Sequence, residues 1–167
     1  MELSLHDIHA DSVELAIDRA RQYRSLLEPE IAESICLDVL HIQPDNQQAR
    51  IIYILALTDQ IDVSGSQSPF QAIETAIELL DNPYQQQYYT GIYFERRARF
   101  MLSQPMSRAF AYDYFVKALQ CYQQAEKIRP EHNDESILRW NSCVRTIARE
   151  KLKPVSEQDK VQMSRES

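Results

Sequence analysis

Residues 118–130 read ALQCYQQAEKIRP, and this stretch decides the fold class of the chain. Ala118, Tyr122 and Ala125 follow one another at steps of four and three residues, which places them on one face of a helix. Two small side chains on that face let a neighbouring helix approach closely, and the tyrosine fills the groove between helices. Pro130 ends the helix, because its ring removes a backbone donor and clashes with the preceding turn. The stretch therefore predicts a helix that packs tightly against other helices.

The composition also favours an all-α fold. The 167 residues include only two glycines, and because tight hairpins and phosphate-binding loops both use glycine, β-rich and nucleotide-binding folds are disfavoured. Ala, Leu, Gln, Glu and Arg, which are good helix formers, are frequent. The length suits one domain with a proper core. We expect a short N-terminal arm at residues 1–10, a helical domain at 11–152, and a disordered tail at 153–167, where apolar residues are few.

Charge and cysteine usage narrow the cellular role. The net charge of −7 and the pI of about 5.1 disfavour nucleic-acid binding, because a phosphate backbone attracts a basic surface. Cys36, Cys121 and Cys143 have no paired spacing, which indicates reduced core thiols. The N-terminus lacks the pattern of a secretion signal, and no apolar run approaches the ~20 residues that span a bilayer. We expect a cytoplasmic protein that does not bind membranes.

The pattern of small residues recurs along the chain. Alanines bracket a predicted turn between two helices three times, at Ala20/Ala32, Ala56/Ala72 and Ala98/Ala118. The separation grows from 12 to 16 to 20 residues, so the insertions fall in the turns, where a loop lengthens at little entropic cost. The predicted helices cover about 11–27, 29–43, 45–61, 69–80, 84–102, 108–129 and 131–151, with a turn-forming cluster at 63–69.

With these positions the chain resembles the tetratricopeptide-repeat family over about residues 12–150. Alanines stand where the family has its tryptophan and glycine. The signature positions of the first unit are filled by Ala16, Ala20, Tyr23, Ala32, Cys36, Val39 and Pro44. The resemblance implies a right-handed α-solenoid of three helix pairs and a C-terminal capping helix. An irregular α-helical bundle is the alternative.

The resemblance further implies a concave groove lined by the first helix of each pair. In that register the groove carries arginines, whose planar guanidinium pairs with carboxylates in a two-point geometry. We therefore expect a non-catalytic adaptor that binds a protein or peptide segment, acidic or bearing a free carboxylate, in this groove. The predicted partner-binding residues are Arg21, Arg24, Arg50, Tyr53, Leu57, Arg99, Leu102 and Arg139.

Other interpretations of the same residues stay open. The arginines could instead form ion pairs with Glu14, Glu33, Glu74 or Glu95 on neighbouring helices. The tyrosines between Tyr84 and Tyr93 could fill the core or form an exposed binding surface. A small bacterial secretion-type chaperone with the same repeats is one alternative function. The groove asparagines of the family's dicarboxylate clamps are replaced by Asp18 and Ile54, which argues against a chaperone-tail clamp.

A helical-bundle enzyme or regulatory subunit is the alternative from another class. His6 and His9, with Asp7 and Asp11 nearby, could bind a metal, but solvated polar residues are the preferred interpretation. The chain has no HExxH motif, and none of the cysteines has a base close to it in the sequence. We therefore predict no catalytic residue, no metal ligand and no cofactor. The sequence predicts neither the partner's identity nor the oligomeric state.

Overall fold

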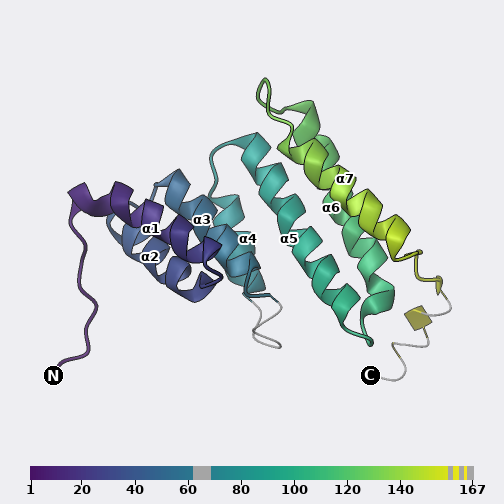
Figure 1. Cartoon of the computed structure of the whole chain (residues 1–167), viewed down its shortest axis with the longest axis horizontal. Coiled ribbons are helices and arrows are strands. Elements are labelled where there is room, and N and C mark those ends of the chain that lie inside the picture. Colours follow the sequence, from purple (N-terminus) through teal and green to yellow (C-terminus); the bar gives the residue numbers. More distant parts are fainter. Residues whose placement is uncertain (62–68, 158–159, 162–163, 165–167) are drawn as a thin grey trace. The chain divides into compact units, whose positions relative to one another are not determined.

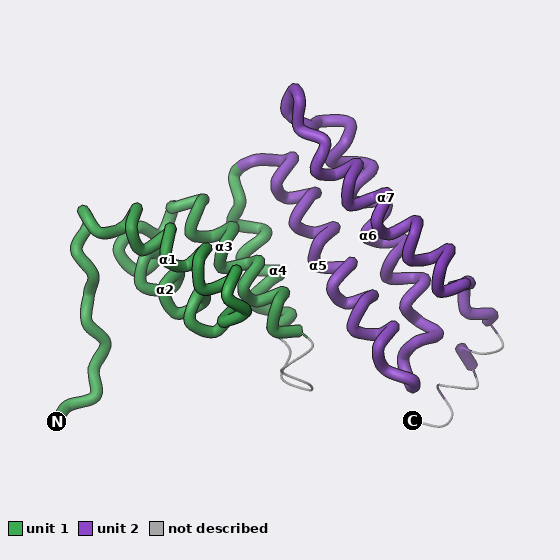
Figure 2. The backbone as a smooth tube through the Cα atoms, viewed as in Figure 1, with its two compact units in different colours: residues 1–81 green, residues 82–167 purple. Residues whose placement is uncertain are grey.

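The computed structural model describes residues 1–61, 69–157, 160–161 and 164. The chain forms two compact units, residues 1–81 and 82–167 (Figure 2). Every regular element among the described residues is a helix, which confirms the all-α prediction. None of the described helices is long and apolar enough to cross a membrane. The boundary between the units falls between the second and the third predicted helix pair.

Unit 1 contains four α-helices that pack in chain order (Figure 1). They are α1 (Val13–Ser25), α2 (Pro29–Ile42), α3 (Gln47–Thr58) and α4 (Phe70–Glu78). Each helix contacts the next, and α1 also contacts α3. Ala20, Ala32 and Ala56 are fully buried, so three of the four predicted small residues of unit 1 belong to its core, whereas Ala72 is half-buried. The predicted turn at 63–69 lies outside the described residues except for Pro69.

The ends of the helices in unit 1 follow from local chemistry. Pro29 occupies the first turn of α2, where a missing backbone donor is harmless. Asn46 caps α3, because its side-chain oxygen accepts from the backbone N–H of Ala49 at 2.9 Å. At the end of α1, Leu27 adopts a left-handed φ of 62°, and the N–H of Glu28 donates to the carbonyl of Tyr23 at 2.9 Å. These caps fix where α1 stops and where α3 starts.

Unit 2 consists of α5 (Pro83–Ser103), α6 (Ala111–Lys127) and α7 (Glu135–Arg149), with α6 packed against both other helices. Ala118, Tyr122 and Ala125 are fully buried, so the stretch that predicted the fold forms the centre of this unit. The close approach of α5 to α6 depends on Gly91, because a Cβ atom there would lie 2.5 Å from Cε1 of Tyr122.

The tyrosines at the start of α5 contribute mainly to the core of unit 2. Tyr84, Tyr88 and Tyr93 are 7 % exposed or less, while Tyr89 and Phe94 are half-buried. Tyr84 and Tyr88 stack with a centroid distance of 5.8 Å, and Tyr88 approaches Tyr122 of α6 at 6.0 Å. Three of the five rings are therefore core residues. The tail at 153–167 is described only in part, so the prediction of disorder there stays a prediction.

Candidate functional site

Two hollows lie between α1 and α3 in unit 1, and we call them together the α1–α3 furrow. The smaller hollow has a volume of about 360 Å³. Its apolar lining comes from α3, and its two arginines come from α1. The lining residues are Arg21, Arg24, Ser25, Gln48, Ile51, Ile52 and Leu55. An apolar lining beside cationic groups is suited to a ligand that carries both an apolar side chain and a negative charge.

The two arginines of the smaller hollow have different surroundings. Arg24 donates to both carboxylate oxygens of Asp59, from Nε to Oδ2 at 2.6 Å and from Nη2 to Oδ1 at 3.2 Å. This two-point pair ties α1 to the C-terminal end of α3 and is mostly buried, with side chains 29 % and 19 % exposed. Arg24 therefore fixes the wall of the hollow rather than offering a free charge.

Arg21 is the accessible cation of the smaller hollow. Its side chain is 51 % exposed and donates from Nη1 to Oδ1 of Asp18 at 2.9 Å, with a longer contact from Nη2 to Oε1 of Gln48 at 3.5 Å. An exposed ion pair between residues on one helix contributes about 0–1 kcal/mol. Arg21 can therefore take a ligand carboxylate as an additional or alternative partner at little cost.

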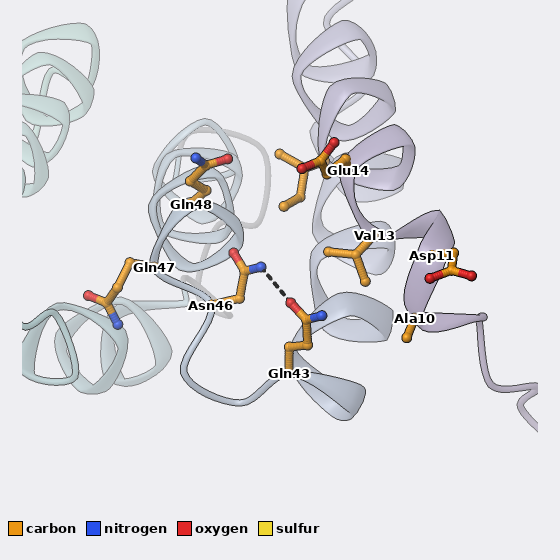
Figure 3. A pocket seen from close by; sticks show the side chains of 9 residues that line it. Ala10, Asp11, Val13, Glu14, Gln43, Asn46, Gln47 and Gln48 are labelled. Carbon is orange, nitrogen blue, oxygen red and sulfur yellow. Dashed lines mark hydrogen bonds between the residues drawn. The ribbon is translucent and has the colours of Figure 1, made fainter.

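The larger hollow lies toward the start of α1 and has a volume of about 620 Å³ (Figure 3). One wall carries the carboxylates of Asp11 and Glu14, and the facing wall carries side-chain amides. Its lining residues are Ala10, Asp11, Val13, Glu14, Ile17, Gln43, Asn46, Gln47 and Gln48. Gln48 lines both hollows, so they adjoin along the same two helices.

Some of the amides in the larger hollow already have structural roles. Asn46 donates from Nδ2 to Oε1 of Gln43 at 2.9 Å while it caps α3. Gln47 accepts from the N–H of Asp81 at 2.9 Å and points away from Glu14 in Figure 3. Glu14 extends from α1 toward the side on which Gln48 lies, whereas Asp11 lies at the outer edge. Glu14 and Gln48 are therefore the polar groups best placed to meet a ligand.

A second polar cluster, the Glu95 network, lies among the three helices of unit 2. Glu95 is 1 % exposed, and its Oε1 accepts from Nε and Nη2 of Arg99 at 3.0 and 2.8 Å. Its Oε2 accepts from the hydroxyl of Tyr122 at 2.6 Å, and Nη1 of Arg139 lies 3.6 Å from Oε1. Arg99 also donates to Ser142 at 3.2 Å and to Thr146 at 3.3 Å on α7. One carboxylate thus connects α5, α6 and α7.

The groups around Glu95 are held in their protonated forms. Burial raises the pKa of Tyr122 well above its usual range, and the negative charge of Glu95 raises it further. Burial, with a smaller contribution from Glu95, raises the pKa of the Cys143 thiol to about 12. Burial alone would lower the pKa of Arg139, but Glu95 and the neighbouring tyrosines outweigh it and the pKa is raised. A thiol and a phenol that keep their protons are weak nucleophiles.

The predicted partner-binding residues fall into several places. Arg21 and Arg24 line the furrow. Arg99 and Arg139 belong to the Glu95 network. Arg139 of α7 approaches Glu95 on a neighbouring helix, as the alternative prediction states, whereas Arg99 pairs with Glu95 within α5 itself. Leu102 is half-buried near the end of α5.

The three predicted residues of α3 lie away from the furrow. Arg50, Tyr53 and Leu57 stand about half a turn from Gln48, because successive helical residues rotate by about 100°. Arg50 donates to the carbonyl of Pro44, and Leu57 is 2 % exposed in the core. Burial, followed by the charge of Glu33, raises the pKa of Tyr53. The α3 residues that line the furrow therefore lie on a different face of the helix from the three predicted ones.

On α3, the residues of the smaller hollow that sequence reasoning missed are Gln48, Ile51, Ile52 and Leu55. They recur at three- and four-residue steps, so the sequence contained a signal for one shared face of α3. Among the described residues, no three His, Cys, Asp or Glu side chains are grouped so that they could hold a metal ion. Comparison of the chain with protein-family models, with curated proteins and with solved structures finds no match.

Proposed function

We propose that this chain is a non-catalytic adaptor of the tetratricopeptide type that holds a peptide segment of a protein partner in the α1–α3 furrow. The observation that carries the proposal is the smaller hollow, which combines an apolar lining with the exposed guanidinium of Arg21. A right-handed solenoid of helix pairs belongs to the same proposal. It is supported by the packing of each helix of unit 1 on the next, by the α1–α3 contact, and by the buried alanines.

The chemistry of the furrow indicates the ligand class. A side chain such as leucine can lie over Ile51 and Leu55, which are half-buried and so still present apolar surface. A neighbouring carboxylate of the segment can accept from Arg21, and charge-assisted hydrogen bonds of this kind are stronger than neutral ones. The partner segment is therefore an acidic peptide with at least one large apolar side chain, or a chain terminus that bears a free carboxylate.

A displayed random-peptide library selected on the full-length chain tests this function. We expect the selected peptides to pair an apolar residue with an acidic one. Fluorescence anisotropy should show at least tenfold weaker binding to Arg21→Glu and to Ile51→Asp. Arg19→Glu is the matched control, because Arg19 is exposed on another side of α1, where it donates to Gln22 at 2.8 Å. Selected peptides that bind both furrow variants as tightly as the unchanged protein would overturn the proposal.

A further inference from the structure

The α1 wall of the furrow changes its charge along its length. Glu14 stands in the larger hollow and Arg21 in the smaller one, seven residues further along the same helix. At a rise of 1.5 Å per residue, their backbone positions are about 10 Å apart along the α1 axis. The furrow therefore presents an anionic group and a cationic group at a fixed separation on one wall.

The larger hollow is suited to a cationic group. Its nine lining residues, all of which the structure describes, include two carboxylates, three glutamines and an asparagine, but no Lys, Arg or His. Glu14 extends toward the side of Gln48 (Figure 3), so a carboxylate and an amide oxygen can approach the same ligand group. An ammonium or guanidinium that enters this hollow could donate hydrogen bonds to the carboxylate and amide oxygens that line it.

The separation of the two charges matches a short step along an extended peptide. An extended chain advances about 3.3 Å per residue, so about 10 Å corresponds to three residues. We propose that the furrow recognises the order of charges in its ligand, taking a segment in which a Lys or Arg and an Asp or Glu are three positions apart. This inference rests on the proposed function, and it adds the basic residue and its spacing to the acidic and apolar residues already assigned.

Glu14 and Arg21 also have structural roles, and the experiment has to separate these roles from ligand recognition. Glu14 lies in the first turn of α1 and Asp11 in the short 3-10 helix just before it, where negative charge also stabilises the start of α1. Glu30 likewise lies in the first turn of its helix, α2, and its side chain is exposed. Glu30→Lys is therefore the matched control for Glu14→Lys, since both lose a first-turn carboxylate but only Glu14 faces the furrow. Asp18, which accepts a hydrogen bond from Arg21, is left unchanged in every variant.

The test uses fluorescent ten-residue peptides that differ only at the two charged positions. All carry one leucine next to the second charged position, and the pairs are Lys…Glu, Glu…Lys, Lys…Lys, Glu…Glu and uncharged Gln…Gln, each three positions apart. We expect one of the two mixed orders to bind at least tenfold more tightly than both like-charged peptides. Glu14→Lys should remove its advantage over Glu…Glu, whereas Glu30→Lys should leave that advantage unchanged.

The charge-exchanged variant Glu14→Lys with Arg21→Glu gives the decisive measurement, because it should prefer the opposite mixed order. Thermal unfolding of each variant shows that the fold is retained. The inference is overturned if the mixed peptides bind within twofold of Gln…Gln, or if the exchanged variant keeps the original preference. Peptides that bind equally well whatever their charge order, yet lose binding in Ile51→Asp, would remove the inference and leave the binding function standing. Failure of every peptide to bind would remove both.

Discussion

The hydroxyl of Tyr122 on α6 donates to the buried carboxylate of Glu95 on α5 at 2.6 Å. Both groups are 1 % exposed or less, and the same carboxylate accepts from Arg99 and lies 3.6 Å from Arg139 of α7. Hydrogen bonds to a charged acceptor in a buried site are stronger than those between neutral groups at the surface. The pair therefore holds the three helices of unit 2 together through one side chain.

Removing this hydroxyl should weaken unit 2. We expect Tyr122→Phe to lower the free energy of unfolding by about 2 kcal/mol, a value within the range measured for hydrogen bonds to charged partners. Urea denaturation followed by circular dichroism measures the change. Tyr112→Phe is the control, since Tyr112 is on the same helix and only half-buried. Equal effects of the two substitutions would show that the contact with Glu95 does not stabilise the fold.

Gly91 should be needed because Tyr122 occupies the space next to it. Alanine at this position would gain about 1 kcal/mol of helix propensity, but its Cβ would meet the tyrosine ring at 2.5 Å. Overpacking of a core costs about 1–3 kcal/mol, so we expect Gly91→Ala to be destabilising overall. In a Tyr122→Leu background, where the ring is missing, the same substitution should become neutral or stabilising. A double-mutant cycle by urea denaturation measures the change of sign, and additive effects would contradict this explanation.

Ala118 is fully buried on α6, a helix that packs against both α5 and α7. Ala118→Leu should therefore force α6 away from a neighbouring helix and lower the free energy of unfolding by about 1–3 kcal/mol. Ala148→Leu is the matched control, because Ala148 is an exposed alanine of α7. Differential scanning calorimetry of the two variants should show a lower melting temperature for Ala118→Leu alone.

Stability should fall at alkaline pH because of the buried thiols. Burial raises the pKa of Cys36 and of Cys143 from 9.0 to about 12, and that of Cys121 to about 11. Above pH 9 the unfolded chain loses these protons while the folded chain keeps them, so ionisation favours the unfolded state. Each thiol then lowers the free energy of unfolding by up to about 1.4 kcal/mol per pH unit until the pH reaches its folded pKa.

Urea denaturation between pH 8 and pH 11 under reducing conditions checks this expectation. In Cys143→Ala, the free energy of unfolding should fall less steeply with rising pH, because one of the three thiols no longer contributes to the fall. The raised pKa values also imply that iodoacetamide modifies the folded protein slowly and the urea-unfolded protein quickly at pH 8. An unchanged slope in Cys143→Ala, together with rapid modification of the folded protein, would contradict the burial of this thiol.

The helices were predictable because their signals are local. Pro29 and Pro83 lie in the first turns of α2 and α5, and the buried alanines at 20, 32, 98 and 118 follow the expected spacing. These features depend on neighbours within one helix or on the smallest side chains between two. Composition and periodicity were therefore sufficient to predict an all-α chain and most of the helix bounds.

The sites were less predictable because they depend on tertiary packing. Glu95 and Arg99 have the spacing of an ordinary exposed ion pair, and only the packing of α6 and α7 over them makes the carboxylate 1 % exposed. The repeat pattern predicts that Leu57 faces a partner, whereas the structure buries Leu57 and places Gln48 and Ile51 in a hollow that residues of α1 also line. Which face of α3 meets α1 depends on the crossing of the two helices, and no local pattern fixes that crossing.

The ion pair between Arg24 and Asp59 has a consequence for how a ligand would enter. Because it joins the last turn of α1 to the end of α3, it restrains the spacing of the two helices at that end of the furrow. If the furrow binds the peptide proposed above, a receptor restrained in this way loses little conformational freedom on association, and more of the ordering entropy falls on the peptide. Stiffening that peptide in its extended form would then tighten binding more than stiffening the protein.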